Sequence, residues 1–598
     1  MMVKNKIKFL VLLVAASLFT ISFIPVGNAS KNYSTENINL SLDIDYLYNL
    51  SENLSNIIFT EYDESAGEIA KGRAFGTKGE HKAAEIIFEN MSDLGLDPKY
   101  EKINNTCEQP FLITKLDINE IELNCFNKSN NKTIEIDDFY NSGNWNLTGI
   151  KHIINFIKIQ NPLIGLIFER FVKSIIIRRN GSFDKNYNIY DIEQLNYNFS
   201  YKNLKVVKKP FNHSFLKDIQ SGKKYNEPFV YISKDFYFTN WTKEKVEFEG
   251  FIYNSFFKIF GRFFSNFVSE VMIEELLIRI LQPNCKGLIV VDSNYDTYNM
   301  APYTFHPLPI ISINRSVGEE ILENPDNFEI DFYVNQEYNN SVESYNVIGS
   351  IEGINKNETV IISSLYDSWW CQGTADSAIA MSMVLTIAKY FKENNIIPKR
   401  NIKFIAFGAE EYGFRGAEYY EYTHRDEFVS YVLDLNQLGY TPQHPENIRL
   451  QIWSNDEIVN QSMVDFLDKT NYSKRTGVDF ATRIRIDGGP SNTRPFAESD
   501  YANIRNCKTI LFVKTGIGFN SPNWLHHHRD GIDHTHGDVI DYFNITDTEV
   551  TTELALNVTK YLAIEKEDEE VEKDTRFGNR NPLINGLTEL FEKKLFKE

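Results

Sequence analysis

The sequence contains few cysteines. Its 598 residues include five, Cys107, Cys125, Cys285, Cys371 and Cys507, and no two of them form a Cys-x-x-Cys pair. A small odd number excludes a scaffold held by many disulfides, and the missing pair excludes the common cysteine-based zinc motifs. Cys107 and Cys125 are near enough in sequence to form one disulfide bond.

A basic excess is also missing. The chain has 62 Lys and Arg residues against 82 Asp and Glu residues, which gives a formal net charge of −20. Nucleic-acid binders need a basic face, so we expect no nucleic-acid partner. Hydrophobic residues make up 42% and charged residues 24%, an ordinary globular composition, and the chain is long enough for several cores.

The N-terminal segment has a pattern typical of export. A short basic start precedes an apolar run over residues 9–24, and small residues Gly27 and Ala29 stand where a signal peptidase cuts. The alternative is an uncleaved anchor that attaches the chain to a membrane, because the run is near spanning length. Either interpretation predicts an extracellular or cell-surface protein.

Glycosylation sequons support export. Asn-x-Ser/Thr occurs roughly twenty times, for example at Asn49, Asn131, Asn240, Asn357 and Asn544. Chance gives on the order of seven such sites in a chain of this composition. The excess predicts an exported glycoprotein.

The chain divides by pattern into an α/β domain with an insertion. The middle region has strand-like pieces and two long apolar helices at 150–177 and 251–281, which either pack between layers or act as a membrane-surface helix or lid. The predicted parts are a signal peptide or anchor (1–29), the start of the main domain (36–115), the insertion (116–340), the rest of the main domain (341–564) and a charged tail (565–598).

The fold class follows from the region after residue 344. Strand and helix patterns alternate there, which is typical of an α/β domain whose central sheet is mostly parallel and flanked by helices. The predicted strands are Val360–Tyr366, Asn401–Gly408, Tyr431–Gly439 and Thr509–Val513, and the clearest helix is Ser377–Phe391.

Polar residues follow several of these strands. In open α/β sheets the site lies at the carboxyl ends of the strands, and carboxylates with imidazoles on adjacent loops suit zinc. Each has an ordinary alternative: a helix cap for Asp376, an exposed pair for Glu410 and Glu411, a solvated loop for the histidines. The residues concerned are Asp367, Asp376, Glu410, Glu411, Asp434, Asn436, His526, His527, His528, His534 and His536.

Several blocks resemble one known family. The chain is similar to the zinc aminopeptidase family that includes bacterial leucyl aminopeptidases, glutamate carboxypeptidase and glutaminyl cyclases. The blocks are GRAFGTKGEHKAAEII, SYNVIGSIEG, SLYDSWWCQGTADSA, FIAFGAEEYGFRGAEYY, VLDLNQLG and DHTHGDVID, spread over residues 72–541. The blocks CKGLIVVD and LPIISINRSVGEEIL resemble the protease-associated domain often inserted in this family.

The resemblance implies roles for five residues. Asp376 matches the aspartate that bridges two zinc ions, and Glu411 and His534 match further metal ligands. Glu410 resembles the general base that takes a proton from the attacking water, and Asp367 resembles the aspartate that orients the first histidine ligand. A peptide or protein is then the expected substrate.

Two departures put the second metal in doubt. The first histidine ligand is replaced by Leu365, and a family aspartate ligand is replaced by Asn436. Both positions serve the same metal, and leucine cannot ligate while an amide is a poor zinc ligand. Residues 491–496, SNTRPF, also depart from the family's Ser-Asp-His pattern. We therefore expect one zinc ion, held by Asp376, Glu411 and His534.

Three functions remain open on the sequence alone. The first is an exported zinc-dependent peptidase of aminopeptidase type, with Glu410 as general base. The second is a one-zinc acyl-transfer enzyme of the glutaminyl cyclase type. The third is a catalytically silent binding protein, since Leu365 and Asn436 remove ligands that the family uses for catalysis.

Overall fold

The computed structural model describes about half of the chain in separate stretches. Residues 1–41, with the predicted signal peptide or anchor, both predicted apolar helices and most of the charged tail lie outside these stretches. None of the helices in the described part has the length and apolar character that a membrane crossing requires. The described residues are 42–57, 72–103, 115–135, 139–141, 197–208, 227–234, 284–291, 310–313, 315–339, 343–368, 371–411, 413–441, 448–486, 488–498, 507–516 and 537–566.

The described strands form two eight-stranded sheets. In the first sheet the order is β1 (Lys99–Ile103), β10 (Ser344–Ile351), β12 (Arg400–Phe407), β11 (Asn355–Leu365), β13 (Val429–Asn436), β16 (Lys508–Gly516), β14 (Ile448–Ser454) and β15 (Phe480–Ile484). In the second sheet it is β3 (Lys132–Glu135), β2 (Lys115–Asn127), β9 (Phe328–Asn339), β5 (Tyr197–Lys208), β6 (Phe229–Lys234), β7 (Cys285–Val291), β8 (Ile310–Ile313) and β4 (Phe139–Asn141).

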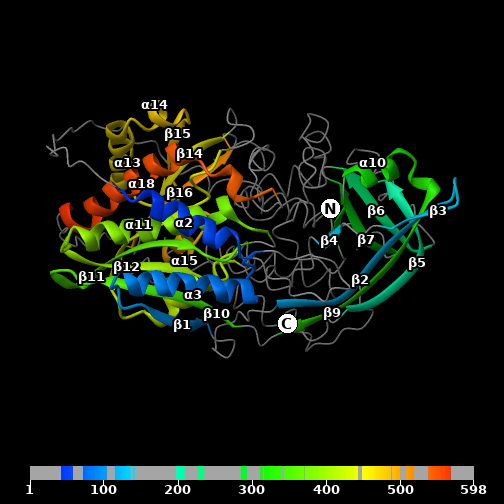
Figure 1. The fold of residues 1–598 in the computed structure, drawn as a ribbon, viewed down its shortest axis with the longest axis horizontal. Helices are drawn as coiled ribbons and strands as arrows, with labels where there is room; N and C mark the ends of the chain where they lie inside the picture. Colours follow the sequence, from blue (N-terminus) through cyan, green and yellow to red (C-terminus); the bar gives the residue numbers. More distant parts are fainter. Residues whose placement is uncertain are drawn as a thin grey trace, which may run out of the picture. The chain divides into compact units, whose positions relative to one another are not determined.

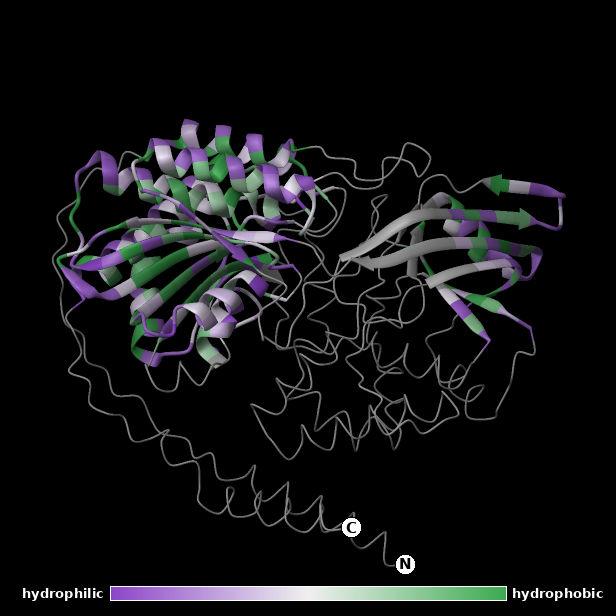
Figure 2. Cartoon of the chain, turned by 90° about the horizontal axis from the view of Figure 1, so that it is seen from below, coloured by the Kyte–Doolittle hydropathy of each residue, from purple (hydrophilic) through white to green (hydrophobic). Residues whose placement is uncertain are grey.

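The first sheet is parallel at its centre. Strands β12, β11, β13 and β16 pair in parallel, while β1, β10 and β14 pair antiparallel at the flanks. The residues of β13 are all buried, as are the last eight of β11, which is typical of parallel strands covered on both faces. Figure 2 shows these strands as hydrophobic ribbons between helices of mixed hydropathy. The predicted α/β fold with a mostly parallel central sheet is confirmed.

Helices cover both faces of this sheet. Helices α2 (Ile44–Ser55), α11 (Ile379–Glu393) and α18 (Ile545–Lys560) pack together on one side (Figure 1), and α13 (Glu457–Thr470) and α14 (Tyr472–Thr476) contact α18. On the other side α3 (Lys78–Asp93) and α12 (Arg415–Thr423) contact β10, and α15 (Thr493–Glu498) contacts α12, β13 and β16. Short helical turns are η5 (Thr374–Ala378), η7 (Ile540–Tyr542) and η8 (Tyr561–Glu565).

Helix α3 illustrates how local sequence fixes an element. Thr77 caps its N-terminus, since its hydroxyl accepts a hydrogen bond from the Glu80 backbone N–H at 3.3 Å. Ala83, Ile87 and Met91 recur at helical spacing and are fully buried. These apolar residues form the face of the helix that is buried in the main domain, where α3 contacts β10.

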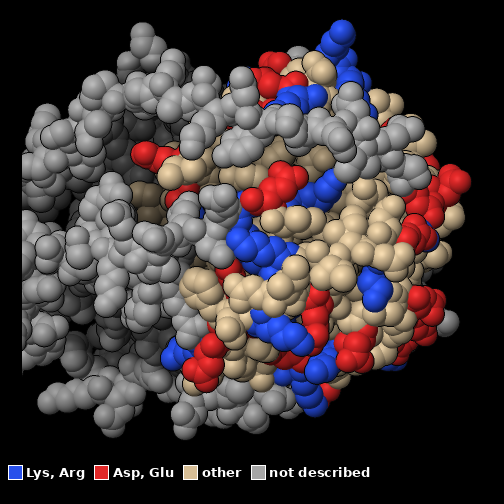
Figure 3. Space-filling view, turned by 90° about the vertical axis from the view of Figure 1, so that its left-hand side faces the viewer, with Lys and Arg blue, Asp and Glu red and all other residues tan. Residues whose placement is uncertain are grey.

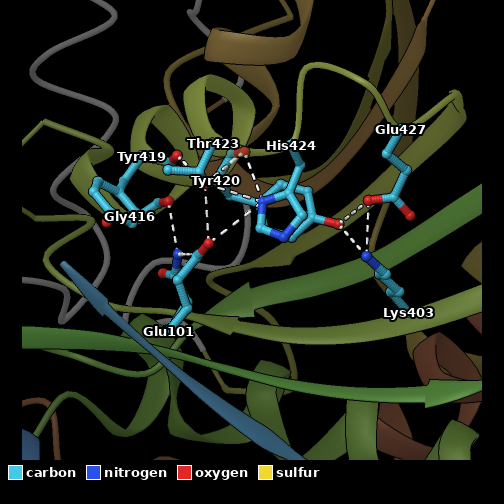
Figure 4. Close-up of polar contacts among 9 residues, drawn as sticks. Glu101, Lys403, Gly416, Tyr419, Tyr420, Thr423, His424 and Glu427 are labelled. Carbon is cyan, nitrogen blue, oxygen red and sulfur yellow. Dashed lines mark hydrogen bonds and ion pairs between the residues drawn. The ribbon is translucent and has the colours of Figure 1, made fainter. Parts of the chain in front are cut away.

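Helix α12 follows the Glu410–Glu411 pair and is held by polar contacts on both sides (Figure 4). The Tyr420 hydroxyl accepts from Lys403 Nζ of β12 at 2.8 Å and donates to Glu427 Oε2 at 2.7 Å. The Thr423 hydroxyl is 3.0 Å from Glu101 Oε1 of β1. These contacts fix the helix against two strands, and so fix the end of the loop that carries both glutamates.

The second sheet comes from residues that lie between β1 and β10 in sequence. Its strands β5, β6, β7 and β8 pair in parallel, and β3, β2, β9 and β5 pair antiparallel. Helix α10 (Arg315–Glu323) packs on β6 and β7, followed by the turn η4 (Pro325–Asn327). The block CKGLIVVD contains β7, and the block LPIISINRSVGEEIL contains β8 and most of α10.

One of the two cysteines that are near enough in sequence to pair is described by the structure. Cys125 is a free, buried thiol in β2, and burial raises its pKa to about 12. Its side chain belongs to the hydrophobic core of the second sheet. Its possible partner Cys107 lies outside the described residues.

Candidate metal centre

Acidic residues gather where the parallel strands of the first sheet end. Asp367 comes two residues after β11, and Glu410 and Glu411 follow β12 closely. Asn436 is the last residue of β13, and Asp376 lies in the turn η5. All are less than 7% exposed. The structure therefore brings together the described candidates at the edge predicted from the sequence.

Asp367 holds the loop that carries the glutamate pair. Its two carboxylate oxygens accept hydrogen bonds from the backbone N–H groups of Glu410 and Glu411, each at 3.1 Å. The family resemblance assigns to this aspartate the orientation of a histidine, but that position is Leu365, fully buried at the end of β11. The observed contact of Asp367 is with the glutamate loop.

Asp376 is positioned from two directions. Gln437 Nε2 donates to Asp376 Oδ2 at 2.9 Å, and the Ser377 hydroxyl is 3.0 Å from Asp376 Oδ1. The carboxylate of Asp538 accepts from the backbone N–H groups of Ala375 at 2.7 Å and of Asp376 at 3.1 Å. The turn is thus attached to the segment that follows the late histidines.

Asn436 takes part in a hydrogen-bond network with Glu410. Its Nδ2 lies 3.0 Å from the Ser491 hydroxyl and 3.5 Å from Glu410 Oε1, while its Oδ1 is 2.8 Å from the Ser377 hydroxyl. Ser491 also lies 3.2 Å from Glu410 Oε1 and 2.6 Å from Asp434 Oδ2. An amide can serve this network because it offers a donor and an acceptor at once.

Burial and mutual repulsion define the electrostatics. Burial, followed by the charges of Glu411 and Asp367, raises the pKa of Glu410 well above its usual value. Burial, followed by Glu80 and Glu411, does the same to the pKa of Asp367, against its two backbone hydrogen bonds. Burial also raises the pKa of Asp434 to about 6. Closely packed carboxylates with raised pKa values require a positive charge in order to ionise together.

Arg73 provides one buried positive charge beside the cluster. Its guanidinium donates to the carbonyl oxygens of Tyr366 at 2.8 Å, Leu54 at 2.9 Å, Gln372 at 2.5 Å and Gly373 at 2.9 Å. Burial lowers its pKa, while Cys371, Asp538, Asp367 and Asp376 raise it. The side chain therefore ties the end of β11 to helix α2 and to the start of the Asp376 turn.

The close packing at this turn explains one glycine. Gly373 has φ +60°, and a Cβ atom added there would lie 2.4 Å from Ser368 Cβ and 2.5 Å from the Asp376 carbonyl oxygen. Only glycine adopts this backbone conformation without strain and leaves that space.

The described carboxylates fit a metal ion only in part. Among the described residues no group of three or more His, Cys, Asp or Glu side chains is arranged to hold a metal ion. Asp376 and Glu411 offer carboxylate oxygens, and burial, followed by the charges of Asp538, Glu411 and Asp376, raises the pKa of the Cys371 thiol well above its usual value. The predicted third ligand, His534, and the histidines at 526–528 and 536 lie outside the described residues. Two carboxylates in an excess of buried negative charge suit a divalent cation that takes a third ligand from elsewhere.

Three residues that position the candidate site, Glu80, Arg73 and Gln437, were not predicted from the sequence. Glu80 accepts from the backbone N–H of Ala409, next to the glutamate pair, at 3.1 Å, and from the Ser344 hydroxyl at 2.5 Å. Arg73 and Gln437 complete the set. A signal for Glu80 existed, since Thr77 and Glu80 have the spacing of a capping box, but a capping box does not indicate that the carboxylate also reaches a loop 329 residues away.

Comparison with known proteins identifies part of the chain. Residues 346–551 match the sequence model of Peptidase family M28. Comparison with curated proteins gives no match. The fold is similar to that of BSAP, a zinc aminopeptidase from Bacillus subtilis, with a TM-score of 0.53 and 15% identity over 89% of this chain and 98% of that chain. A Peptidase M28 precursor from Shewanella amazonensis gives a TM-score of 0.51 and 14% identity, covering 88% and 97%.

Proposed function

Because residues 346–551 belong to peptidase family M28, we propose that the chain is an exported zinc-dependent metallopeptidase of aminopeptidase type that hydrolyses peptide bonds. The observation that carries the proposal is the buried cluster of Asp367, Asp376, Glu410 and Glu411 at the carboxyl ends of the parallel strands. Enzymes of this fold class react at that edge.

In this proposal one zinc ion is held by Asp376, Glu411 and His534. Zinc, when bound, supplies Lewis-acid chemistry that polarises a carbonyl group and makes water more acidic. Asp367 accepts hydrogen bonds from the backbone N–H groups of Glu410 and Glu411. One carboxylate therefore positions both the proposed base, Glu410, and the proposed zinc ligand, Glu411. Gln437 and Ser377 orient Asp376.

Glu410 is the proposed general base. Its Oε1 is engaged by Ser491 and Asn436, which fixes the carboxylate in the site. A carboxylate with a raised pKa is a stronger base than one in water, so it can take a proton from the attacking water and return it to the leaving amine. A positioned proton acceptor of this kind contributes typically 10²–10⁴-fold to a rate.

The second metal position of the family is absent in this proposal. Leu365 offers no ligand, and both sides of the Asn436 amide are occupied by Ser377, Ser491 and Glu410. The hydrogen-bond network occupies the place where a carboxylate would serve a second ion. One zinc ion per chain is therefore the expected stoichiometry.

The first test is the metal content of the purified protein by inductively coupled plasma mass spectrometry, with Asp376→Ala in parallel. We expect about one zinc per chain, lost in the variant, because three protein ligands suffice for zinc binding. Two ions per chain would contradict the one-metal proposal. No bound metal after zinc loading would contradict the zinc proposal altogether.

The second test is turnover on a broad panel of peptides and aminoacyl amides, with Glu410→Gln as the matched control. We expect zinc-dependent cleavage that falls at least 100-fold in the variant, which keeps the shape of the side chain but removes its basicity. Mass spectrometry on N-terminal glutaminyl peptides covers the cyclase alternative, for which loss of ammonia would replace cleavage.

A catalytically silent binding protein is the second candidate. The observation in its favour is that Asn436 and Ser491 both approach the same oxygen of Glu410, which leaves less of the proposed base for substrate. Bound zinc with no turnover on any panel would support this candidate. Zinc-dependent and Glu410-dependent turnover would exclude it.

The remaining proposals concern export of the chain and its division into domains. The predicted signal peptide or anchor at 1–29 and the sequons support export, and the second sheet supports a protease-associated-like insertion at 116–340. Secretion with intact glycans, measured by peptide-N-glycosidase treatment of protein from the culture medium, tests the first of these.

A further inference from the structure

The sheet face that carries Asp434 and Asn436 continues across β16, β14 and β15. Asn436 is paired with Val513, and Val513 with Gln451, so their side chains point to the same face. Neighbouring strands are about 4.8 Å apart, which places Gln451 roughly 10 Å from Asn436. This face therefore extends from the candidate site to the β15 edge of the sheet.

Three arginines lie on this face near Gln451. Arg449 precedes Gln451 by two residues in β14, and Arg483 is paired with Trp453 in the neighbouring strand. Arg485 follows Arg483 by two residues, with its guanidinium 5.1 Å from the Trp453 ring centre. Burial, and then the charges of Arg449 and Arg485, lower the pKa of Arg483. The three positive groups are thus close to one another.

Several polar atoms here are buried without a partner. Within the described part of the chain, Gln451 is fully buried and neither its Nε2 nor its Oε1 has a hydrogen-bond partner. Arg449 Nε and Arg483 Nη1 are likewise buried and unpaired among the described residues. Three of these four atoms are donors, and nearly all buried donors in proteins are satisfied. Donors on or beside positively charged groups thus predominate among these atoms, and an acceptor with negative charge would satisfy them.

The arrangement is unusual for this chain. The net charge is −20, and on the face shown in Figure 3 basic and acidic side chains are intermixed. In contrast, no ion pair joins Arg449 or Arg483 to an acidic side chain within the stretches that the structure covers. Opposite Gln451, the neighbouring strand carries the small side chain of Ala481.

A single segment connects Trp453, the strand partner of Arg483, to the candidate site. Gly489 packs against the same face, since a Cβ atom added there would lie 2.7 Å from Trp453 Cε3 and 2.9 Å from Leu511 Cδ2. Two residues later the Ser491 hydroxyl is 3.2 Å from Glu410 Oε1. Two residues of chain span at most about 7 Å. Trp453, which pairs with Arg483, therefore lies within reach of a short extended peptide from Glu410.

We propose that Arg449, Gln451 and Arg483 form a subsite for a carboxylate, the acidic side chain of a peptide substrate whose scissile bond lies at Glu410. This rests on the proposed peptidase function. The planar guanidinium groups match a carboxylate with two parallel hydrogen bonds, and Gln451 Nε2 adds a third donor. An extended peptide rises about 3.3 Å per residue, so the distance to Glu410 is covered by one or two residues with their side chains.

The direct test is binding of glutarate, a mimic of the glutamate side chain, to the zinc-supplemented full chain by isothermal titration calorimetry. We expect binding by the wild type, at least tenfold weaker binding by Arg449→Gln and Arg483→Gln, and wild-type binding by Arg425→Gln, an exposed arginine that removes the same charge elsewhere. Neutral glutaramide should not bind. Equal affinity of all variants for glutarate would overturn the proposal.

Two further arms separate the sources of the negative charge. Inorganic sulfate that binds with the same arginine dependence, while glutarate does not bind, would overturn the acidic-substrate proposal in favour of a free inorganic anion. In hydrolysis assays on a peptide pair that differs only by Glu against Gln, we expect a preference for Glu that falls at least tenfold in Arg483→Gln. An unchanged preference would overturn the proposal.

The proposed function can fail separately from this subsite. Glutarate binding that depends on Arg449 and Arg483, together with no turnover by the wild type on any peptide, would contradict the peptidase function while leaving the carboxylate site in place. Turnover that depends on Glu410, without any arginine-dependent binding of glutarate, would support the peptidase function and contradict the carboxylate subsite.

Discussion

At the residue scale, one amide decides how the candidate centre differs from a two-metal site. Asn436 donates toward Ser491 and Glu410 and accepts from Ser377, a set of contacts that no carboxylate can make at neutral pH. An aspartate would place a further negative charge beside Glu410 and Asp434. The neutral side chain thus limits the charge that the buried cluster must bear.

The first prediction concerns restoration of the missing ligands. Asn436→Asp alone should lower the free energy of unfolding by about 1–3 kcal/mol, because it buries a charge beside carboxylates and removes a donor. It should leave zinc at about one ion per chain. The double variant Leu365→His with Asn436→Asp should bind about two, since both lost ligands return. Urea unfolding and metal analysis measure these effects.

The outcome that counts against this prediction is specific. A second ion in Asn436→Asp alone would mean that Leu365 is not what prevents metal binding. Leu365→His alone serves as the matched control, because it adds one ligand without changing the Asn436 network.

The second prediction concerns pH and Glu80. Burial raises the pKa of Glu80 to about 7 from an ordinary value near 4.5. The folded state therefore binds this proton more tightly, so its contribution is greatest below pH 4.5 and is lost as the pH rises toward 7. The full change is on the order of 3 kcal/mol. Glu80→Gln should remove this part of the slope in urea unfolding between pH 5 and 8.

Glutamine at this position loses one acceptor for the Gly76 N–H, so the absolute stability of the variant shifts. The slope with pH, rather than the level, is the measured quantity. A slope equal to that of the wild type would contradict the role assigned to Glu80.

Residues of the candidate site were predictable where they follow a strand that the sequence reveals. Asp367, Asp376, Glu410 and Glu411 follow strands that the hydrophobic pattern reveals, so their meeting at one edge could be expected. Ser491 and Gln437 could not be assigned a partner, because hydrogen bonds between residues 81 and 61 positions apart leave no local pattern.

At the element scale, strand cores were easier to predict than strand ends. The predicted strand Tyr431–Gly439 continues past the observed end of β13 at Asn436, because the backbone turns at Gln437, which has φ +52°. The predicted helix at Ser377 begins two residues early, since Ser377 belongs to the turn that positions Asp376. In both cases the regular element is interrupted at the candidate site.

The third prediction concerns the attachment of three elements by Arg73. Arg73→Lys keeps the charge but cannot reach four carbonyl groups in a fork, so several stay unpaired in the interior. We expect a loss of roughly 3 kcal/mol or more in urea unfolding. Zinc retention during dialysis should also weaken, because the Asp376 turn loses its support.

The control is Arg475→Lys, which alters a partly exposed ion pair with Glu553 and should change stability by less than about 1 kcal/mol. If Arg73→Lys behaves like this control, the carbonyl contacts of Arg73 contribute little to the turn.

At the scale of the whole molecule, metal binding should appear as global stability. A ligand that binds only the folded state stabilises it by about 2.7 kcal/mol at a free concentration 100 times its dissociation constant. Removal of zinc by a chelator should therefore lower the urea midpoint, and zinc should restore it. In Asp376→Ala neither step should have an effect. A chelator effect that persists in the variant would place the metal elsewhere.

The Asn436 network has a consequence for evolutionary reversibility. Ser377, Ser491 and Glu410 are all satisfied by the amide, so a return of aspartate alone disturbs three contacts before any benefit appears. A histidine in place of Leu365 alone would still lack the carboxylate at position 436 that completes the second metal site of the family. A lineage with this arrangement would therefore need both substitutions together to regain the second ion. Because neither single substitution restores the metal site, the loss would be hard to reverse by neutral drift.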